Sequence, residues 1–171
     1  MRRNRFLVVA FALTLSCAGT TSLPKPGEIA MKPFSFRMRD FKAPSGLRII
    51  VQEDHSAPVA GVVNVVGVGS SSEPEGKEGI AHFLEHMAFR MKPFKDSEAT
   101  MWELLPRNGV AEFNAYTAFD NTTYFEFGPK EMLPQILRLE GARMIDPERG
   151  IDQKVVDTER EVVRNELRER G

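Results

Sequence analysis

Residues 79–90, GIAHFLEHMAFR, hold the pattern that decides the expected fold and chemistry of this chain. The chain has three histidines, and two of them, His82 and His86, lie four residues apart in this segment. In a helix, positions i and i+4 lie on one face, so both imidazoles can reach the same metal ion. Glu85 lies on that face, about 60° from His82 at 100° per residue. Its carboxylate could hold and deprotonate a water without binding the metal.

The rest of this helix is apolar, with Ile80, Leu84 and Met87 on the side opposite the histidines. This pattern predicts a helix packed on a core, with its polar face on a cleft. The plainer interpretation is a helix with two histidines that are exposed or satisfied within the core. The apolar flanking sequence leaves little polar surface for such a helix, so we favour the metal site.

A catalytic zinc site needs a third protein ligand and one open position. On a helical wheel, residues 155–167 form an apolar valine stripe, and Glu159 and Glu166 fall in the middle of it. Burying two carboxylates among valines costs several kcal/mol unless they are paired or bind a metal. We therefore expect Glu166 to be the third ligand; the alternative is a pair of buried salt bridges to arginines. His55 is a rival ligand, but its acidic turn is more typical of a surface.

Strands and helices follow one another in mixed order, which predicts an α+β layered domain with an antiparallel or mixed sheet and helices packed on it. The first two strands should form a hairpin around the turn at 44–46, and the third should be a buried strand. Strands are expected at 34–38, 47–51, 59–68, 113–117 and 122–127, and helices at 79–90, 97–105, 130–144 and 151–170.

The N-terminal residues have the pattern of an export signal. Three arginines precede the apolar run 6–15, which is too short to span a bilayer, since about 20 residues are needed. The segment ending in Cys17 resembles a bacterial lipoprotein cleavage box. We expect residues 1–17 to be a signal peptide, Cys17 to be lipidated, and residues 18–33 to be an extended linker. The alternatives are ordinary secretion with cleavage nearby, or an uncleaved N-terminal anchor.

The composition and net charge of the chain limit the classes of partner that are expected. The chain has 171 residues, 42% of them hydrophobic and 27% charged, which is ordinary for one globular domain. Its net charge of −1 gives no sign of the basic face that nucleic-acid binders usually carry, so no nucleic-acid partner is expected. Cys17 is the only cysteine, which excludes an intrachain disulfide framework. The expected location is the bacterial cell envelope, in the periplasm and attached to the membrane by the lipid.

Several motifs together resemble one family of enzymes. The histidines and glutamate stand in the order HxxEH, reversed from the commoner HExxH. The strand at 46–51, the G-x-x-x-E loop at 69–73 and the N-A-x-T strand at 114–117 match the pattern as well. The chain from residue 34 onward thus resembles the N-terminal domain of the pitrilysin/insulysin metallopeptidases, the inverzincins that include mitochondrial processing peptidase. One departure is Met91-Lys92-Pro93, where the family usually has Gly-Thr.

The resemblance implies one Zn²⁺ per chain, a LuxS/processing-peptidase-like fold and zinc-dependent endopeptidase activity on peptides or unfolded segments. Its zinc ligands would be His82, His86 and Glu166. Its catalytic residues would be Glu85 as the base and Glu159, which would hold a histidine ligand in place. The strand with Asn114 and Ala115 would bind the peptide substrate as an added β-strand.

The resemblance also affects two further expectations: how much of the domain this sequence covers, and which other functions the fold could serve. Family domains continue beyond the glutamate helix and usually pair with a second domain, whereas this sequence stops at Gly171. We therefore expect residues 34–171 to be a partial zinc peptidase domain, completed by a second peptidase-like domain or subunit. The alternative function is a non-catalytic envelope lipoprotein that uses the fold for binding or assembly. A structural zinc site would need a fourth ligand, and no cysteine but Cys17 is available.

Overall fold

A computed structural model of the chain describes residues 37–170, which belong to two compact units, one ending at Asp54 and one beginning at His55. The predicted signal peptide, the lipidation site Cys17 and the linker lie outside the described residues. Among residues 37–170, none of the helices combines the length and the apolar character needed to cross a membrane.

The first unit holds a β-hairpin in its described part. Strand β1 (Arg37–Lys42) pairs antiparallel with β2 (Arg48–Glu53), so the predicted hairpin is confirmed, although its first strand lies later than expected. Arg48 bonds both carboxylate oxygens of Asp40 across the strands, at 3.1 and 2.6 Å. The hydrogen bond from Arg48 lowers the pKa of Asp40 below its ordinary value.

The second unit holds a three-stranded antiparallel sheet and four α-helices, which confirms the α+β class. Strand β5 lies in the middle of the sheet, between β3 and β4, and the predicted hairpin of β4 and β5 is present. The elements are β3 (Val59–Val66), η1 (Ser70–Ser72), α1 (Ile80–Arg90), α2 (Met101–Arg107), β4 (Glu112–Thr117), β5 (Thr122–Pro129), η2 (Lys130–Met132), α3 (Leu133–Ile145) and α4 (Gln153–Arg170).

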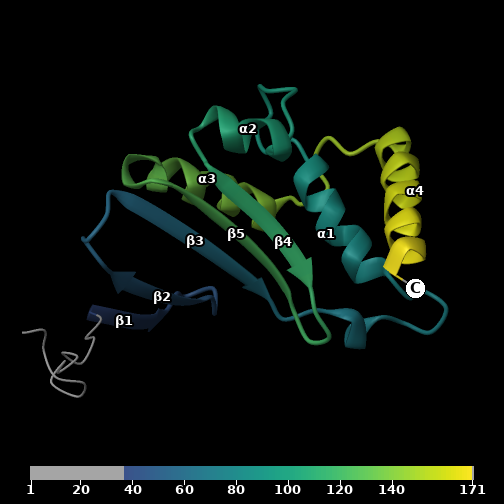
Figure 1. Ribbon diagram of the computed structural model, residues 1–171, viewed down its shortest axis with the longest axis horizontal. Coiled ribbons are helices and arrows are strands. Elements are labelled where there is room, and N and C mark those ends of the chain that lie inside the picture. The colour runs from purple at the N-terminus through teal and green to yellow at the C-terminus, as the bar shows by residue number, and fades with distance from the viewer. Residues whose placement is uncertain (1–36, 171) are drawn as a thin grey trace, which may run out of the picture. The chain divides into compact units, whose positions relative to one another are not determined.

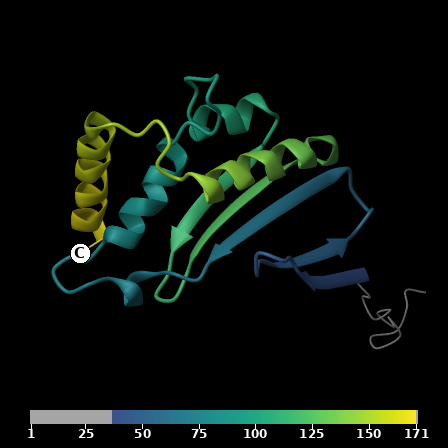
Figure 2. The ribbon, with the colours of Figure 1, turned by 180° about the vertical axis from the view of Figure 1, so that it is seen from behind.

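Helices α1 and α3 pack on the same face of this sheet, and α4 lies beside α1 (Figures 1 and 2). The core lies between these helices and the sheet, because each element turns an apolar side toward it. Its buried side chains come from three helices, the strand β5 and the connections between them. They are Ala88, Phe89, Met91, Met101, Leu105, Val110, Tyr124, Ile136 and Leu139.

Strand β3 differs from the expectation of a buried strand. Val59, Val63 and Val65 are about 60% exposed (62%, 58% and 61%), whereas Val62, between them, packs against the core. Successive side chains of a strand point to opposite faces, and the helices of this unit cover only one face of the sheet. The valine-rich run therefore forms an edge strand with one apolar face outward, and the prediction that it is buried was wrong.

Helix α2 begins later than predicted, at Met101 rather than Ser97. Thr100 forms a capping box with Glu103: the Thr100 hydroxyl accepts from the Glu103 backbone N–H at 3.4 Å, and the Glu103 carboxylate accepts from the Thr100 N–H at 2.8 Å. These bonds satisfy backbone donors that would otherwise lack partners at the helix start. The capping pair therefore decides where the helix starts.

Three ionisable residues lie inside the core, between the sheet and α3. Arg143 pairs with Glu126 and with Glu140, each at 3.2 Å, and none of the three side chains is more than 5% exposed. Asn64 of β3 donates to Glu140 at 3.1 Å. Burial, followed by repulsion from Glu140, raises the pKa of Glu126 to about 8. At neutral pH Glu126 is therefore mostly protonated.

Two leucines of α3 provide a matched test of this packing. Leu139 is fully buried, whereas Leu137, two residues earlier, is 53% exposed. Leu139→Ala should lower the free energy of unfolding by about 2–5 kcal/mol because it leaves a cavity in the core. Leu137→Ala should change it by no more than about 0.5 kcal/mol. Chemical denaturation of both variants checks this, and equal losses would contradict the described orientation of α3.

The buried Glu126 should make stability fall as pH rises. Between pH 4.5, the ordinary value, and about 8, folded Glu126 keeps a proton that the unfolded chain releases. The free energy of unfolding should therefore decrease through this window, with a contribution of up to about 1.4 kcal/mol per pH unit. Glu126→Gln should remove this contribution, whereas Glu131→Gln, at an exposed site, should not. Denaturation curves from pH 5 to 8 that stay parallel for parent and Glu126→Gln would contradict it.

Candidate metal centre

The start of α1 is held by the loop that precedes it. Glu73 accepts hydrogen bonds from the backbone N–H groups of Gly79 and Ala81, at 2.9 and 2.8 Å, so its carboxylate caps the helix. Gly69 lies against the β4–β5 turn, where an added Cβ would be 2.3 Å from the carbonyl oxygen of Ala118. The Gly69–Glu73 motif therefore sets the position at which the helix with the two histidines begins.

The structure brings His82, His86 and Glu166 together. One potential ligand atom from each of the three lies within 4.8 Å of the other two. His82 Nε2 is 3.4 Å from Glu166 Oε2, and His86 Nε2 is 3.6 Å from Glu166 Oε1. The two imidazole rings meet edge to face, with centroids 4.8 Å apart. All three side chains are partly buried, with 15% to 33% of each exposed.

Glu159 lies one step further along the α1–α4 interface and contacts His86. Its Oε2 is 3.3 Å from His86 Nδ1, and its Oε1 forms an ion pair with Arg90 Nε at 2.7 Å. Its side chain is only 4% exposed. Of the two predicted partners for Glu159, the structure brings His86 into contact with it. A carboxylate that accepts from Nδ1 leaves Nε2 of that ring directed at Glu166.

Glu85, the predicted base, points to the sheet side of α1. It is buried at 8% exposure, and Thr117 of β4 donates a hydrogen bond to its Oε2 at 2.5 Å. The Thr117 hydroxyl also lies 3.4 Å from that of Thr122 on β5. The carboxylate is therefore held by the end of β4, at the part of α1 that carries the two histidines.

The other predicted residues lie apart from this cluster. Asn114 and Ala115 lie on β4, where Asn114 is exposed and Ala115 faces the core. Among the described residues, β4 pairs with β5 alone, so its other side is an open sheet edge. His55, the rival third ligand, is exposed and takes no part in the cluster of possible ligands found in residues 37–170.

The apolar side of α1 is less buried than expected. Met87 and Ala88 face the core, but Leu84 is 55% and Ile80 is 38% exposed. The sheet lies on the Glu85 side of the helix, so that glutamate is buried while Leu84 is not. The expectation that the polar side of α1 faces a cleft and its apolar side faces the core was therefore wrong for Glu85, which faces the sheet. It was also wrong for Leu84 and Ile80, which are exposed.

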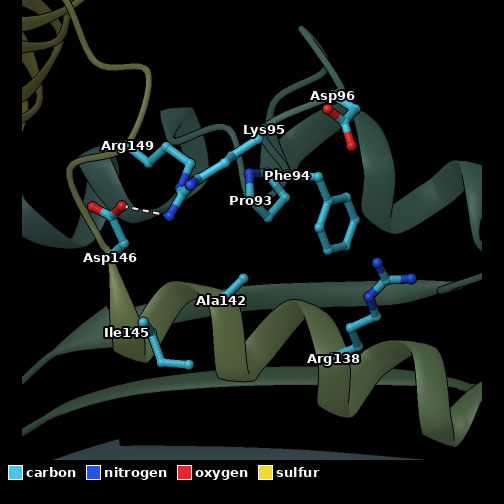
Figure 3. A pocket seen from close by; sticks show the side chains of 9 residues that line it. All are labelled: Pro93, Phe94, Lys95, Asp96, Arg138, Ala142, Ile145, Asp146 and Arg149. Carbon is cyan, nitrogen blue, oxygen red and sulfur yellow. Dashed lines mark ion pairs between the residues drawn. The ribbon is translucent and has the colours of Figure 1, made fainter.

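A hollow of about 280 Å³ lies elsewhere on the molecule, between α3 and the segment 93–96 (Figure 3). Cationic side chains line much of it: Arg149 pairs with Asp146 at 2.7 Å, and Arg138 lies over the Phe94 ring at 4.5 Å. None of the residues that line it belongs to the histidine cluster. It is thus separate from the candidate metal centre.

The donor atoms of the cluster suit zinc. Zinc in proteins binds imidazole nitrogens and carboxylate oxygens at about 2.0–2.2 Å, so tetrahedral donors lie about 3.3 Å apart. The separations of 3.4 and 3.6 Å between the imidazole Nε2 atoms and the Glu166 oxygens are close to this. Three protein ligands, with no fourth in the cluster among the described residues, match a catalytic rather than a structural site.

Comparison with known proteins agrees with this fold. The family model described as Insulinase (Peptidase family M16) matches residues 48–170. The chain is a member of this insulinase-type peptidase family.

Two relatives illustrate the similarity in sequence. The chain is 30% identical over 150 residues to the probable mitochondrial-processing peptidase subunit beta of Schizosaccharomyces pombe, covering 88% of this chain and 29% of that protein. It is 32% identical over 124 residues to an uncharacterized zinc protease of Mycobacterium bovis, covering 72% of this chain and 27% of the relative. The chain therefore spans less than a third of the length of these relatives.

Solved structures show the same fold. A protease from Helicobacter pylori superposes with a TM-score of 0.68 at 29% identity, covering 78% of this chain and 31% of that one. Pitrilysin also superposes with a TM-score of 0.68, at 25% identity, covering 79% of this chain and 14% of its own. The match of both sequence and fold agrees with the resemblance that the motifs indicated.

The sequence analysis gave no role to two residues of the centre. Thr117 bonds Glu85, and Arg90 pairs with Glu159. Arg90 could have been found, because it follows His86 by four residues and so lies on the same face of the helix. Thr117 ends the N-A-x-T motif, but its contact with Glu85 depends on how the sheet packs against α1.

Glu166 can be tested as a zinc ligand by direct binding. The parent chain should bind about one zinc ion, as a site with two histidines and one carboxylate requires. Glu166→Ala should weaken binding by more than the roughly 10- to 100-fold loss typical of residues outside the ligand set. Glu161→Ala, on the exposed side of the same helix, should have no such effect. Zinc affinity that survives in Glu166→Ala at matched folding would assign the third ligand elsewhere.

Proposed function

We propose that this chain carries the zinc site of a metalloendopeptidase and takes part in hydrolysis of peptide bonds in peptides or unfolded segments. The observation that carries the proposal is the meeting of His82, His86 and Glu166, with ligand atoms within 4.8 Å of one another. Membership in a peptidase family supports it, as does the name zinc protease given to the mycobacterial relative.

In this proposal each residue of the centre has a distinct role. The histidines and Glu166 hold the zinc ion, which when bound supplies a Lewis acid for the substrate carbonyl and for a water molecule. Glu85 accepts the proton of the attacking water and passes it to the leaving amine. The hydrogen bond from Thr117 keeps one carboxylate oxygen of Glu85 fixed for this task.

We further propose that β4 binds the substrate. Its outer edge has no strand partner among the described residues, and its end at Thr117 reaches Glu85. An extended peptide could add to this edge through main-chain hydrogen bonds, with Asn114 and Ala115 beside it. Recognition through the main chain would tolerate many side-chain sequences.

The matched residues cover less than a third of each relative, which supports a second peptidase-like domain or subunit as a partner. Such a partner would close over the substrate from the side that the described residues leave open. We also propose that the protein is exported to the cell envelope and carries a lipid anchor on Cys17. This part of the proposal is based on the N-terminal sequence alone.

Glu85→Gln tests the proposed base. Zinc content should match that of the parent, since Glu85 is not a proposed ligand, while hydrolysis of a quenched fluorescent peptide should fall by about 100- to 10,000-fold. Glu98→Gln, at a site with a 91% exposed side chain, is the control and should keep full activity.

The assay should be run with the chain alone and mixed with a second domain from a family member. Retained hydrolysis in Glu85→Gln would remove this residue from the role of base. Zinc bound by the parent without hydrolysis under either condition would instead favour the non-catalytic envelope lipoprotein.

A further inference from the structure

The side chain of Arg90 ends at the carboxylate that contacts His86. Arg90 Nε forms an ion pair with Glu159 Oε1 at 2.7 Å, and the other oxygen of Glu159 lies 3.3 Å from His86 Nδ1. One carboxylate therefore joins a guanidinium on one side to an imidazole on the other. Arg90 itself contributes no atom to the cluster of possible ligands.

The helix geometry explains why these three groups meet. His86 and Arg90 are four residues apart on α1, so both side chains lie on the face that packs against α4. Glu159 extends from α4 toward this face, with only 4% of its side chain exposed. Its two oxygens can thus engage two successive turns of α1.

A carboxylate this deeply buried needs a cation. Removing the partner of a buried charge is strongly destabilising, because the remaining charge has lost its water and its pair. Arg90 is the only cation that pairs with Glu159 among the described residues, apart from His86 when charged. Without Arg90, the position that Glu159 now holds beside His86 would be strongly disfavoured.

The orientation of His86 depends in turn on Glu159. An imidazole that donates Nδ1–H to a carboxylate is fixed in one tautomer and one ring orientation, with Nε2 left free to bind a metal. Arg90 is held on its far side as well, because its guanidinium lies 6.0 Å from the centre of the Trp102 ring. The contacts therefore run from Trp102 through Arg90 and Glu159 to His86.

We propose that Arg90 is a positioning residue of the zinc site, which fixes the ring of His86 by holding Glu159 in place. The inference rests on the proposed function, since it assigns a role toward the same zinc ion. It adds a residue that is not one of the possible zinc ligands.

Zinc affinity measured by competition with a chelating dye tests this role on the purified chain. Arg90→Met should raise the zinc dissociation constant by about 10- to 100-fold, the loss typical of residues that orient metal ligands. Arg90→Lys should recover most of that loss, because it keeps a cation next to Glu159. Arg160→Met, beside Glu159 in sequence but paired with Asp157 on the exposed side, is the matched control and should leave affinity unchanged.

A double-variant cycle separates this role from a general contribution to folding. Glu159→Gln removes the buried charge, so adding Arg90→Met to it should weaken zinc binding no further, although the single Arg90→Met does. The comparison holds even if Arg90→Met alone fails to fold, because the double variant leaves no unpaired charge inside. Additional weakening in the double variant would overturn the inference, as would equal zinc affinity in parent and Arg90→Met.

The parent result distinguishes this inference from the proposed function. A parent chain that binds zinc while Arg90→Met binds it equally well would overturn the role of Arg90 alone. A folded parent that binds no zinc would overturn the proposed function, and the role of Arg90 with it.

Discussion

The buried carboxylate of Glu159 is the constraint on which the arrangement of the centre depends. It joins two helices whose contacting residues, His86 and Glu159, are 73 positions apart in the chain. Because it needs partners at both oxygens, it sets how α1 and α4 are rotated toward each other. Glu166 lies seven residues, or about two turns, further along α4, and so comes to face His82. The two helices therefore run antiparallel, with one row of side chains from each meeting at the interface.

The sheet supplies a second constraint on α1, from another side. Thr117, at the end of β4, holds Glu85, while His82 and His86 face α4. Helix α1 thus directs its two histidines at α4 and its proposed base, Glu85, at β4. Metal binding and proton transfer therefore use different sides of the helix. Since β4 is also an open edge, the strand that holds the base is the one that could accept a peptide. Binding and proton transfer would then meet at the same end of the sheet.

Much of the fold could be predicted, because the start and end of several helices and strands follow from the residues within and beside them. The hairpin of β4 and β5 and the helix α1 lie within a residue or two of the predicted ranges. The errors occur where packing against other elements decides the outcome. Strand β3 is rich in valine, yet Val59, Val63 and Val65 are exposed, because helices cover only one face of the sheet. The start of α2 depended on a capping pair at Thr100 that periodicity alone does not reveal.

The sequence by itself determined which chemical groups are available: two histidines four residues apart on one helix with a glutamate between them, and two glutamates seven residues apart in a valine stripe. Side-chain spacing on a helix follows from its pitch, so these sets were visible without coordinates. Only the tertiary structure decided which members meet. It brought Glu166 to the histidines, set Glu159 between His86 and Arg90, and turned Glu85 toward Thr117. Such contacts depend on how helices and sheet pack over long separations, and no local pattern encodes that geometry.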